Sequence, residues 1–165
     1  MAELTYRAVS ADDGPSLAVV LSEPRVARWL RPLGNAAPFT LAECAARAVE
    51  DAAHWAAHGF GPWVALDSHV VVGHGGLRHR VLNGRAELEV AWAVVASRWG
   101  QGVATAIGRT AIAFARRLGV DEIVAFTRVD NLASLRVMEK LSMTREHEFQ
   151  HAGHPHVLAR VNVSG

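Results

Sequence analysis

Apolar residues recur at helical spacing in two long stretches of this chain and at strand spacing in several short ones. Positions three and four apart are apolar over 41–58 and 103–118, which predicts two long amphipathic helices. Thr40 and Glu43 form a capping-box pattern before the first of them, and Gly59 is placed to end it. Shorter helices are predicted over 12–21, 23–30 and 132–141.

The remaining apolar runs are short, as strands require, and Asn83–Gly84 is a two-residue hairpin signal between two of them. The order of elements is a strand, helices, three antiparallel strands, a strand–helix–strand crossover and a final hairpin. This order predicts one α+β domain over 1–165, with a mixed, mostly antiparallel sheet of about seven strands. The strands are expected over 4–9, 61–66, 69–82, 87–95, 122–128, 146–150 and 157–163.

Charge and composition narrow the class of protein. The chain has 165 residues, of which 17 are basic and 16 acidic, so no general attraction to nucleic acid or to a membrane surface is expected. The single cysteine, Cys44, lies in a helical pattern, cannot form an internal disulfide and is predicted to be in the core. The N-terminal residues lack a signal-peptide pattern, and no apolar run reaches the ~18 residues of a membrane span. We therefore expect a cytoplasmic protein.

The stretch 97–105, SRWGQGVAT, places two glycines at the expected start of the second long helix. A helix start leaves backbone N–H groups unpaired, and glycines let phosphate oxygens approach them. The stretch lacks the Gly-Lys-Ser/Thr of a Walker loop and the third glycine or alanine of a dinucleotide fingerprint. It is either a tight turn before a helix or a phosphate-binding turn. The amides concerned belong to Gly100, Gln101, Gly102, Val103, Ala104 and Thr105.

Two longer segments resemble a known family. WGQGVATAIGRTAIAFA from Trp99, followed by VAFTRVDNLASLRVMEKLSM from Val124, resembles the Gcn5-related N-acetyltransferases (GNAT), and more closely their ribosomal-protein-alanine acetyltransferase subgroup. The family's acetyl-CoA loop, Gln/Arg-x-x-Gly-x-Gly/Ala, falls on Trp99, Gly102 and Ala104, and EVAWAV from Glu89 matches the subgroup's preceding strand. The resemblance implies a three-layer α/β/α fold with a central sheet splayed at its middle, and acetyl-CoA as the cosubstrate.

Acetyl transfer from a thioester to an amine needs a polarised carbonyl and a neutral amine. In this family a backbone N–H of the splayed strand polarises the carbonyl, so the resemblance places Trp92, Ala93 and Val94 against the cofactor. The amide of Trp92 or that of Ala93 is the candidate donor to the carbonyl. Glu89 is the first candidate for the base, and Glu87 is the second because it lies on the same strand face. Both carboxylates could instead be solvated residues at the margin of the sheet.

Asn131 and Ser134 match the family's Asn-x-x-Ser/Ala pair at the start of the next helix. The resemblance implies that Asn131 contacts the pantetheine arm and that Ser134 lies near the sulfur. Asn131 also fits the N-cap of that helix. The tyrosine acid common in the wider superfamily is replaced by Met138, and a frequent C-terminal aromatic by Ala159. These departures leave a second hypothesis open, an acyl-CoA-binding or regulatory domain that has lost catalysis.

The nine histidines raise the question of a metal. His54 and His58 share a helix face but lack the glutamate of a zincin, and the HAGHPH stretch at 151–156 has no completing ligand, so no physiological metal is expected. We expect His154 and His156 to line the acceptor end of the cleft. His74 is an alternative proton acceptor.

The acceptor amine, on a protein N-terminus or a small molecule, is not determined by these patterns, nor is the choice between a monomer and a homodimer. An acidic substrate would suit the basic residues of the 25–31 stretch. These residues are Arg25, Arg28 and Arg31. A different set of basic residues is available for the 3′-phosphate of CoA, namely Arg109, Arg136 and Lys140.

Overall fold

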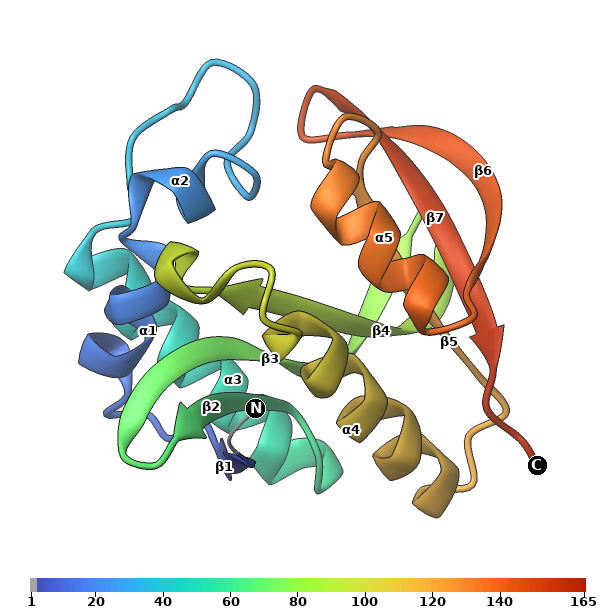
Figure 1. The fold of residues 1–165 in the computed structure, drawn as a ribbon, viewed down its shortest axis with the longest axis horizontal. Coiled ribbons are helices and arrows are strands. Elements are labelled where there is room, and N and C mark those ends of the chain that lie inside the picture. The colour runs from blue at the N-terminus through green and yellow to red at the C-terminus, as the bar shows by residue number, and fades with distance from the viewer. Residues whose placement is uncertain (1–2) are drawn as a thin grey trace.

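A computed structural model describes residues 3–165. It contains a seven-stranded sheet in the order β1-β2-β3-β4-β5-β7-β6, with helices on both faces (Figure 1). The α+β class and the mostly antiparallel sheet are confirmed. The strands are β1 (Leu4–Ala8), β2 (Pro62–Asp67), β3 (Val70–Leu82), β4 (Arg85–Val94), β5 (Glu122–Arg128), β6 (Thr144–His151) and β7 (His154–Asn162). The helices are α1 (Gly14–Leu21), α2 (Pro24–Ala27), α3 (Leu41–His58), α4 (Val103–Arg117) and α5 (Leu132–Lys140), with a 3₁₀ turn η1 (Ala96–Arg98).

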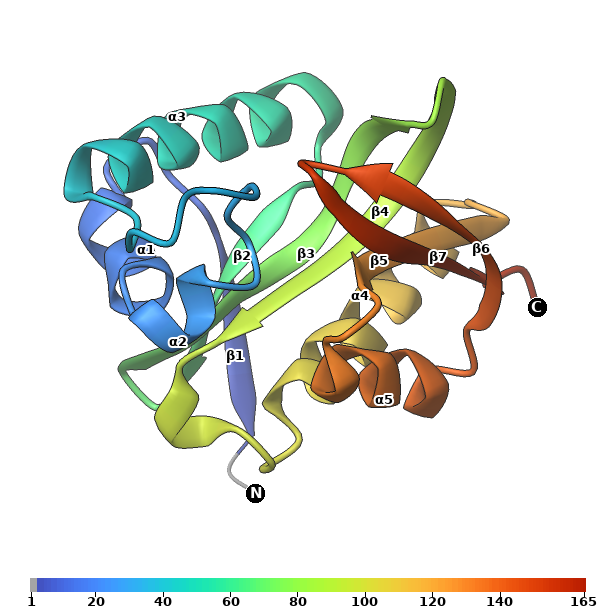
Figure 2. The same ribbon diagram turned by 90° about the horizontal axis from the view of Figure 1, so that it is seen from above.

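The molecule has three layers. Helices α1, α2 and α3 cover one face of the sheet, and α4 and α5 cover the other (Figure 2). Leu17 of α1 and Ile107 of α4 are both fully buried against the β1–β4 half of the sheet. Met138 of α5 is buried with Ile123 and Leu77 in a second cluster, which extends from β2 to β7. Apolar faces predicted at helical spacing therefore form the core.

The sheet opens between its two central strands. β4 and β5 run parallel and pair in register only at Glu89 and Val124, whereas β3 pairs with β4 along ten residue pairs, from Gly73 with Val94 to Leu82 with Arg85. Past Glu89 no further residue of β4 pairs with β5. The splayed middle predicted from the family resemblance is confirmed, and it leaves one edge of β4 without a backbone partner.

Local sequence signals account for the ends of the long helices. Thr40 and Glu43 form the predicted capping box, and Gly59 ends α3 in the left-handed conformation, with φ of 73°. Gly100 and Gly102 have φ of 72° and 82°, a region that glycine enters without steric strain. This turn directs the chain from the end of β4 into α4.

Several boundaries differ from the sequence-based expectation, most clearly at α2 and in the final hairpin. Helix α2 has a single turn over Pro24–Ala27, after which Trp29 and Leu30 donate 3₁₀-type bonds to residues three earlier, ahead of Pro32. Strand β6 begins at Thr144 because it pairs with β7 along its whole length. Within residues 3–165, no helix is both long and apolar enough to cross a membrane.

Candidate functional site

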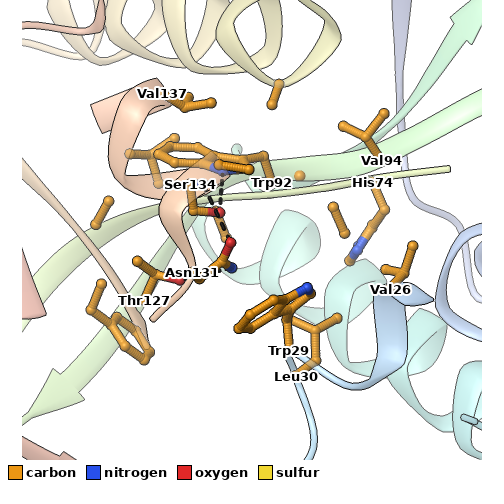
Figure 3. A pocket seen from close by; sticks show the side chains of 18 of the residues that line it. Val26, Trp29, Leu30, His74, Trp92, Val94, Thr127, Asn131, Ser134 and Val137 are labelled. Atoms are coloured by element: carbon orange, nitrogen blue, oxygen red, sulfur yellow. Dashed lines mark hydrogen bonds between the residues drawn. The ribbon is translucent and has the colours of Figure 1, made fainter. Parts of the chain in front are cut away.

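A cavity of about 700 Å³ occupies the opening between β4 and β5 and extends beneath α2 and the loop that follows it (Figure 3). Its walls come from both halves of the sheet, from the turn before α4 and from α5. All but one of the predicted cofactor residues line it, and the exception is Gln101. Gln101 instead bonds locally: its side chain accepts from Arg98 at 3.0 Å and donates to the carbonyl of Ser97 at 3.2 Å. The lining cofactor candidates are Trp92, Ala93, Val94, Gly100, Gly102, Val103, Ala104, Thr105, Asn131 and Ser134.

The turn before α4 supplies backbone amides to one end of the cavity. Gly102 is the N-cap of α4, and no side chain caps the helix there. The first N–H groups of α4 are therefore available to a ligand, and the helix dipole favours an anion at this end. Arg136 and Lys140 of α5 also line the cavity, whereas Arg109 is exposed elsewhere on α4.

The exposed edge of β4 presents one particular amide. The Val95 N–H donates to Val72 of β3 at 3.0 Å, and the carbonyls of Ala91 and Ala93 also lie toward β3. Because successive residues of a strand direct their backbone groups to opposite sides, the amides of Trp92 and Val94 point into the opening. Of the two amides proposed for the thioester carbonyl, the geometry favours that of Trp92 over that of Ala93.

Trp99 closes the far end of this edge. Its indole N–H donates to the carbonyl of Val94 at 2.8 Å, and the ring is 45% exposed. The residue that stands in the place of the family's glutamine or arginine thus satisfies the last open carbonyl of the splayed strand.

Ser134 and Asn131 lie beside the opening (Figure 3). The indole N–H of Trp92 donates to Ser134 Oγ at 3.3 Å. Asn131 caps α5 by accepting from the Ser134 N–H at 3.4 Å, and it donates to Thr127 Oγ1 at 3.1 Å. Because Ser134 Oγ already accepts from Trp92, its own proton is free to be donated into the cavity.

Glu89 lies on the cavity wall and is 4% exposed. It is close to two arginines of β3, with Arg78 Nε at 3.3 Å and Arg80 Nε at 3.6 Å from Oε2. Glu89 is therefore a buried carboxylate in contact with the cavity, as a base requires. The same arginines hold the carboxylate in place.

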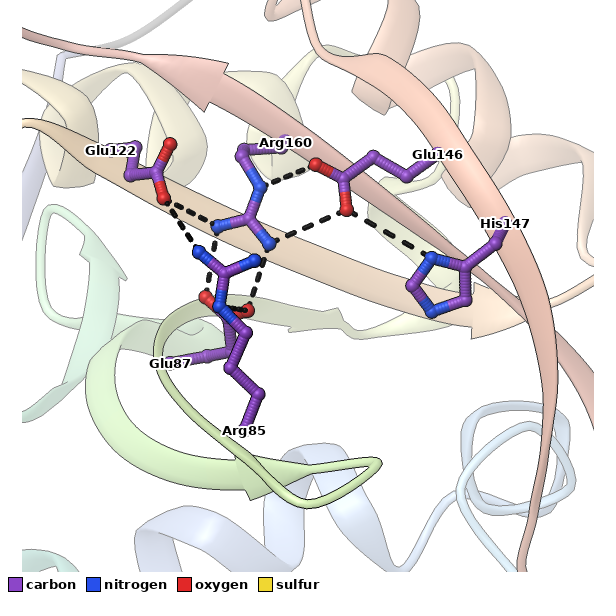
Figure 4. Close-up of polar contacts among 6 residues, drawn as sticks. All are labelled: Arg85, Glu87, Glu122, Glu146, His147 and Arg160. Carbon is purple, nitrogen blue, oxygen red and sulfur yellow. Dashed lines mark hydrogen bonds and ion pairs between the residues drawn. The ribbon is translucent and has the colours of Figure 1, made fainter.

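Glu87 is not in the cavity, which corrects the expectation that it joins Glu89 there. The structure places it in an ionic cluster at the far end of β4 (Figure 4). Arg160 of β7 donates to both Glu87 oxygens, at 2.8 and 2.9 Å, and Arg85 lies 3.2 Å away. Although 87 and 89 share a strand face, β7 covers the first position and leaves the second open. Glu87 thus joins two strands and does not line this cavity.

A histidine–aspartate pair also faces the cavity. His74 Nε2 lies 2.8 Å from Asp51 Oδ2, and the two residues are 7% and 2% exposed. His74 lines the cavity from β3, directly across from Ala93. A carboxylate that fixes one imidazole nitrogen leaves the other available as a proton acceptor. His74 was considered from the sequence, but its partner on α3 was not.

Other histidines divide between the cavity and the surface. His151 and His156 line the cavity, and burial lowers the pKa of both imidazoles. His154 does not line it, which corrects that expectation.

On the surface, His54, His58 and His79 place one ligand atom each within 4.8 Å of one another. His54 Nδ1 is already bonded to the Phe60 carbonyl at 2.8 Å, and its Nε2 accepts the His79 N–H at 3.0 Å. A metal would therefore have to displace existing bonds of His54.

The loop after α2 covers the end of the cavity that lies beneath α2. Arg31 donates to Glu43 at 2.6 and 2.8 Å and to the carbonyls of Ala37 and Pro38, so the loop is anchored to the start of α3. The Leu33 N–H donates to the carbonyl of Ala152 at 2.8 Å, which joins this loop to the β6–β7 turn. The loop thus connects the two halves of the split sheet.

This fold, split between two parallel central strands beside an amide-rich helix start, is that of an acetyltransferase. The profile of the acetyltransferase (GNAT) domain matches residues 3–144, and the chain belongs to that family.

Solved structures of similar fold span nearly the whole chain. A putative GNAT-family acetyltransferase from Bordetella pertussis has a TM-score of 0.79 and 23% identity, covering 95% of this chain and 94% of its own. The ribosomal-protein-S5-alanine acetyltransferase from Vibrio fischeri has a TM-score of 0.75 and 18% identity, covering 98% and 94%. A putative acetyltransferase from Salmonella typhimurium, solved with its cofactor acetyl-CoA, has a TM-score of 0.73 and 19% identity, covering 99% and 96%.

Proposed function

We propose that this protein transfers the acetyl group of acetyl-CoA to a primary amine, on a protein N-terminus or a small molecule, by direct attack in a ternary complex. The observation that carries the proposal is the unpaired edge of β4. It presents the Trp92 amide to the same cavity that receives the first amides of α4. A thioester carbonyl and a pyrophosphate need donors of these two kinds, in this order along an extended ligand.

The cofactor would lie along the opening. The amides from Gly100 to Thr105 hold the pyrophosphate, with positively charged Arg136 and Lys140 nearby on α5. The pantetheine arm runs between β4 and β5 past Asn131, where the strands no longer bond to each other. The thioester oxygen accepts from the Trp92 amide, which stabilises the negative charge that develops on it.

The amine must lose a proton before or during its attack on the carbonyl carbon. Glu89 is the proposed acceptor, acting directly or through a water, and the His74–Asp51 pair is the second candidate because it faces the same space. As the C–S bond breaks, the Ser134 hydroxyl donates a hydrogen bond that stabilises the leaving thiolate, which then takes up a proton from solvent. Met138, in the tyrosine position of the wider superfamily, is 1% exposed in the core and cannot act as the acid.

Binding is tested by thermal shift. At about 100 times its dissociation constant, acetyl-CoA should stabilise the protein by about 2.7 kcal/mol, which corresponds to about 5–10 °C in melting temperature for a chain of this size. Gly102→Glu should remove the shift because it places a carboxylate against the phosphates. Gly84→Glu is the matched control: Gly84 has φ of 78°, like Gly102 at 82°, but lies in the β3–β4 hairpin. No shift at millimolar acetyl-CoA would refute the proposal.

Catalysis is tested by release of the CoA thiol across a panel of amines. Glu89→Gln should abolish turnover while the acetyl-CoA shift persists, and His74→Gln tests the alternative acceptor in the same way. The buried Met138 favours one competing function, a domain that binds acyl-CoA without turnover. Binding without thiol release for any amine would establish that function in place of the enzyme.

A further inference from the structure

The acceptor side of the cavity has a small-residue floor with charges at one end. Strands β3 and β4 present side chains to this face in register, His74 with Ala93, Gly76 with Ala91 and Arg78 with Glu89. Because Gly76, Ala91 and Ala93 have little or no side chain, the sheet between the His74 and Arg78 positions is free for a ligand. One strand face thus offers a binding surface beside the Trp92 amide.

Positive charge exceeds negative charge at the end of this surface. Arg78 and Arg80 contact Glu89, and Arg47 reaches the same region of the cavity from α3. Three guanidinium groups therefore face one carboxylate. Asp51, one helical turn beyond Arg47, is bonded to His74. The other carboxylate that lines the cavity, Asp130, is paired with Arg128 at 2.8 Å.

These arginines also repel one another. Burial lowers the pKa of the Arg47 guanidinium, and the charge of Arg78 lowers it further. Burial likewise lowers the pKa of Arg80, with Arg78 and Arg47 adding to the effect against Glu89. Half-buried cations that repel one another are stabilised by any anion that enters the space between them. The arrangement of these arginines therefore favours binding of an oxyanion between them.

We infer that the acceptor is an amine that also carries an oxyanion group, a carboxylate or a phosphate, which binds to Arg47, Arg78 and Arg80 while Glu89 receives the amine. The inference rests on the proposed function, because it assigns the second substrate of that same cavity. An arginine presents paired donors that match the geometry of a carboxylate or phosphate. A zwitterionic or acidic amine fits this set of charges, and a cationic amine does not.

The CoA phosphates do not account for these arginines. The amide-rich turn follows β4 beyond Val94, whereas Arg78 lies opposite Glu89, five residues back along the strand. At about 3.3 Å per residue the two regions are about 17 Å apart. Nor do the basic residues suggested by the sequence provide the site. Arg31 is bonded to Glu43, and Arg25 and Arg28 do not line the cavity.

The test compares matched amines at saturating acetyl-CoA, with thiol release as the readout. The pairs are L-glutamate with L-glutamine amide, glycine with glycinamide, and O-phosphoethanolamine with ethanolamine. The anionic member of a pair should have a kcat/KM at least tenfold higher, and the pairs separate a carboxylate from a phosphate preference. Arg47→Gln should reduce that ratio by about 10- to 100-fold, as expected for loss of a charged hydrogen bond. Arg47→Lys should retain part of it, and Arg117→Gln, on the exposed side of α4, should leave it unchanged.

Thermal shifts by L-glutamate and O-phosphoethanolamine, measured with and without CoA, report anion binding independently of turnover. A shift that Arg47→Gln abolishes supports the inference even if no amine is acetylated. Equal reaction of neutral and anionic amines, or an Arg47→Gln variant with an unchanged preference, overturns it while an acetyl-CoA shift leaves the proposed function standing. The absence of an acetyl-CoA shift would refute the proposed function and, with it, the acceptor role of a bound anion, even where the anion shifts persist. The absence of any anion shift together with the absence of turnover also overturns it.

Discussion

Removing Arg160 should destabilise the protein through the charge that it leaves behind. The Arg160 side chain is 12% exposed, and Glu87, to which it donates two bonds, is 7% exposed (Figure 4). Breaking a buried ion pair by removing one partner costs about 3–5 kcal/mol. Arg85 remains 3.2 Å from Glu87 but is 62% exposed and screened by solvent, so it offsets part of the loss. For Arg160→Gln we expect unfolding free energy to fall by about 2–3 kcal/mol.

A double-mutant cycle that combines Arg160→Gln with Glu87→Gln identifies the cause of this loss of stability. If the penalty is an unpaired buried carboxylate, Glu87→Gln in the Arg160→Gln background should recover about half of the loss or more, because a neutral amide is cheaper to bury. Glu122 and Glu146 also lose a partner in the variant, but both lie nearer to solvent, at 42% and 32% side-chain exposure. They should contribute little to the cycle.

Urea denaturation at pH 7 measures the unfolding free energy of the unchanged protein, the two single variants and the double variant. A loss of about 2–3 kcal/mol corresponds to a melting temperature about 4–12 °C lower. Thiol release by Glu87→Gln should match that of the unchanged protein, since Glu87 does not touch the cavity. Strictly additive losses, or a double variant less stable than Arg160→Gln, would refute the reasoning. Loss of turnover in a folded Glu87→Gln variant would restore Glu87 as a catalytic candidate.

Three further changes test other parts of the structure. Gly75→Ala should lower the unfolding free energy by about 1–3 kcal/mol in urea denaturation, because its Cβ would lie 2.3 Å from the carbonyl oxygen of Ala91. Bonds from Arg31 lower the pKa of Glu43 from 4.5 to about 2, so the stability from this pair is present above pH 4.5 and lost toward pH 2. Acid titration of melting temperature should show that loss, and Glu43→Gln should lack it. Ser134→Ala should lower kcat by about 10- to 100-fold in thiol release and leave the acetyl-CoA thermal shift intact.

Features set by neighbouring residues in sequence were predictable. The capping box of Thr40 and Glu43 and the N-cap at Asn131 depend on contacts within one helical turn. The glycine turn before α4 likewise follows from its own residues, since only backbone conformation and a helix start are needed. The proposed cofactor half of the site consists of such local features, and for that reason the sequence alone could name residues that line the cavity.

The acceptor half depends on contacts between distant segments. His74 and Asp51 are 23 residues apart, and Glu87 and Arg160 are 73 apart, so no local pattern pairs them. Strand alternation correctly put Glu87 and Glu89 on one face. It could not show that β7 covers one position and leaves the other in the cavity. In the sequence, Arg47 is one of several charged residues on an amphipathic helix. Only the fold shows that it lines the cavity.

The alternation of β4 also explains why the proposed transfer would occur at one place. Trp92 is an even-numbered residue of this strand. Its indole is directed toward Ser134, and its backbone amide points into the opening. Odd-numbered residues direct Glu89 and the small side chains of Ala91 and Ala93 toward α3 and the arginines. One strand thus separates a donor side rich in neutral amides from an acceptor side rich in charge. The acetyl carbon can be reached from both sides only where β4 has no partner strand between them, and the splay is therefore the element on which the proposed chemistry depends.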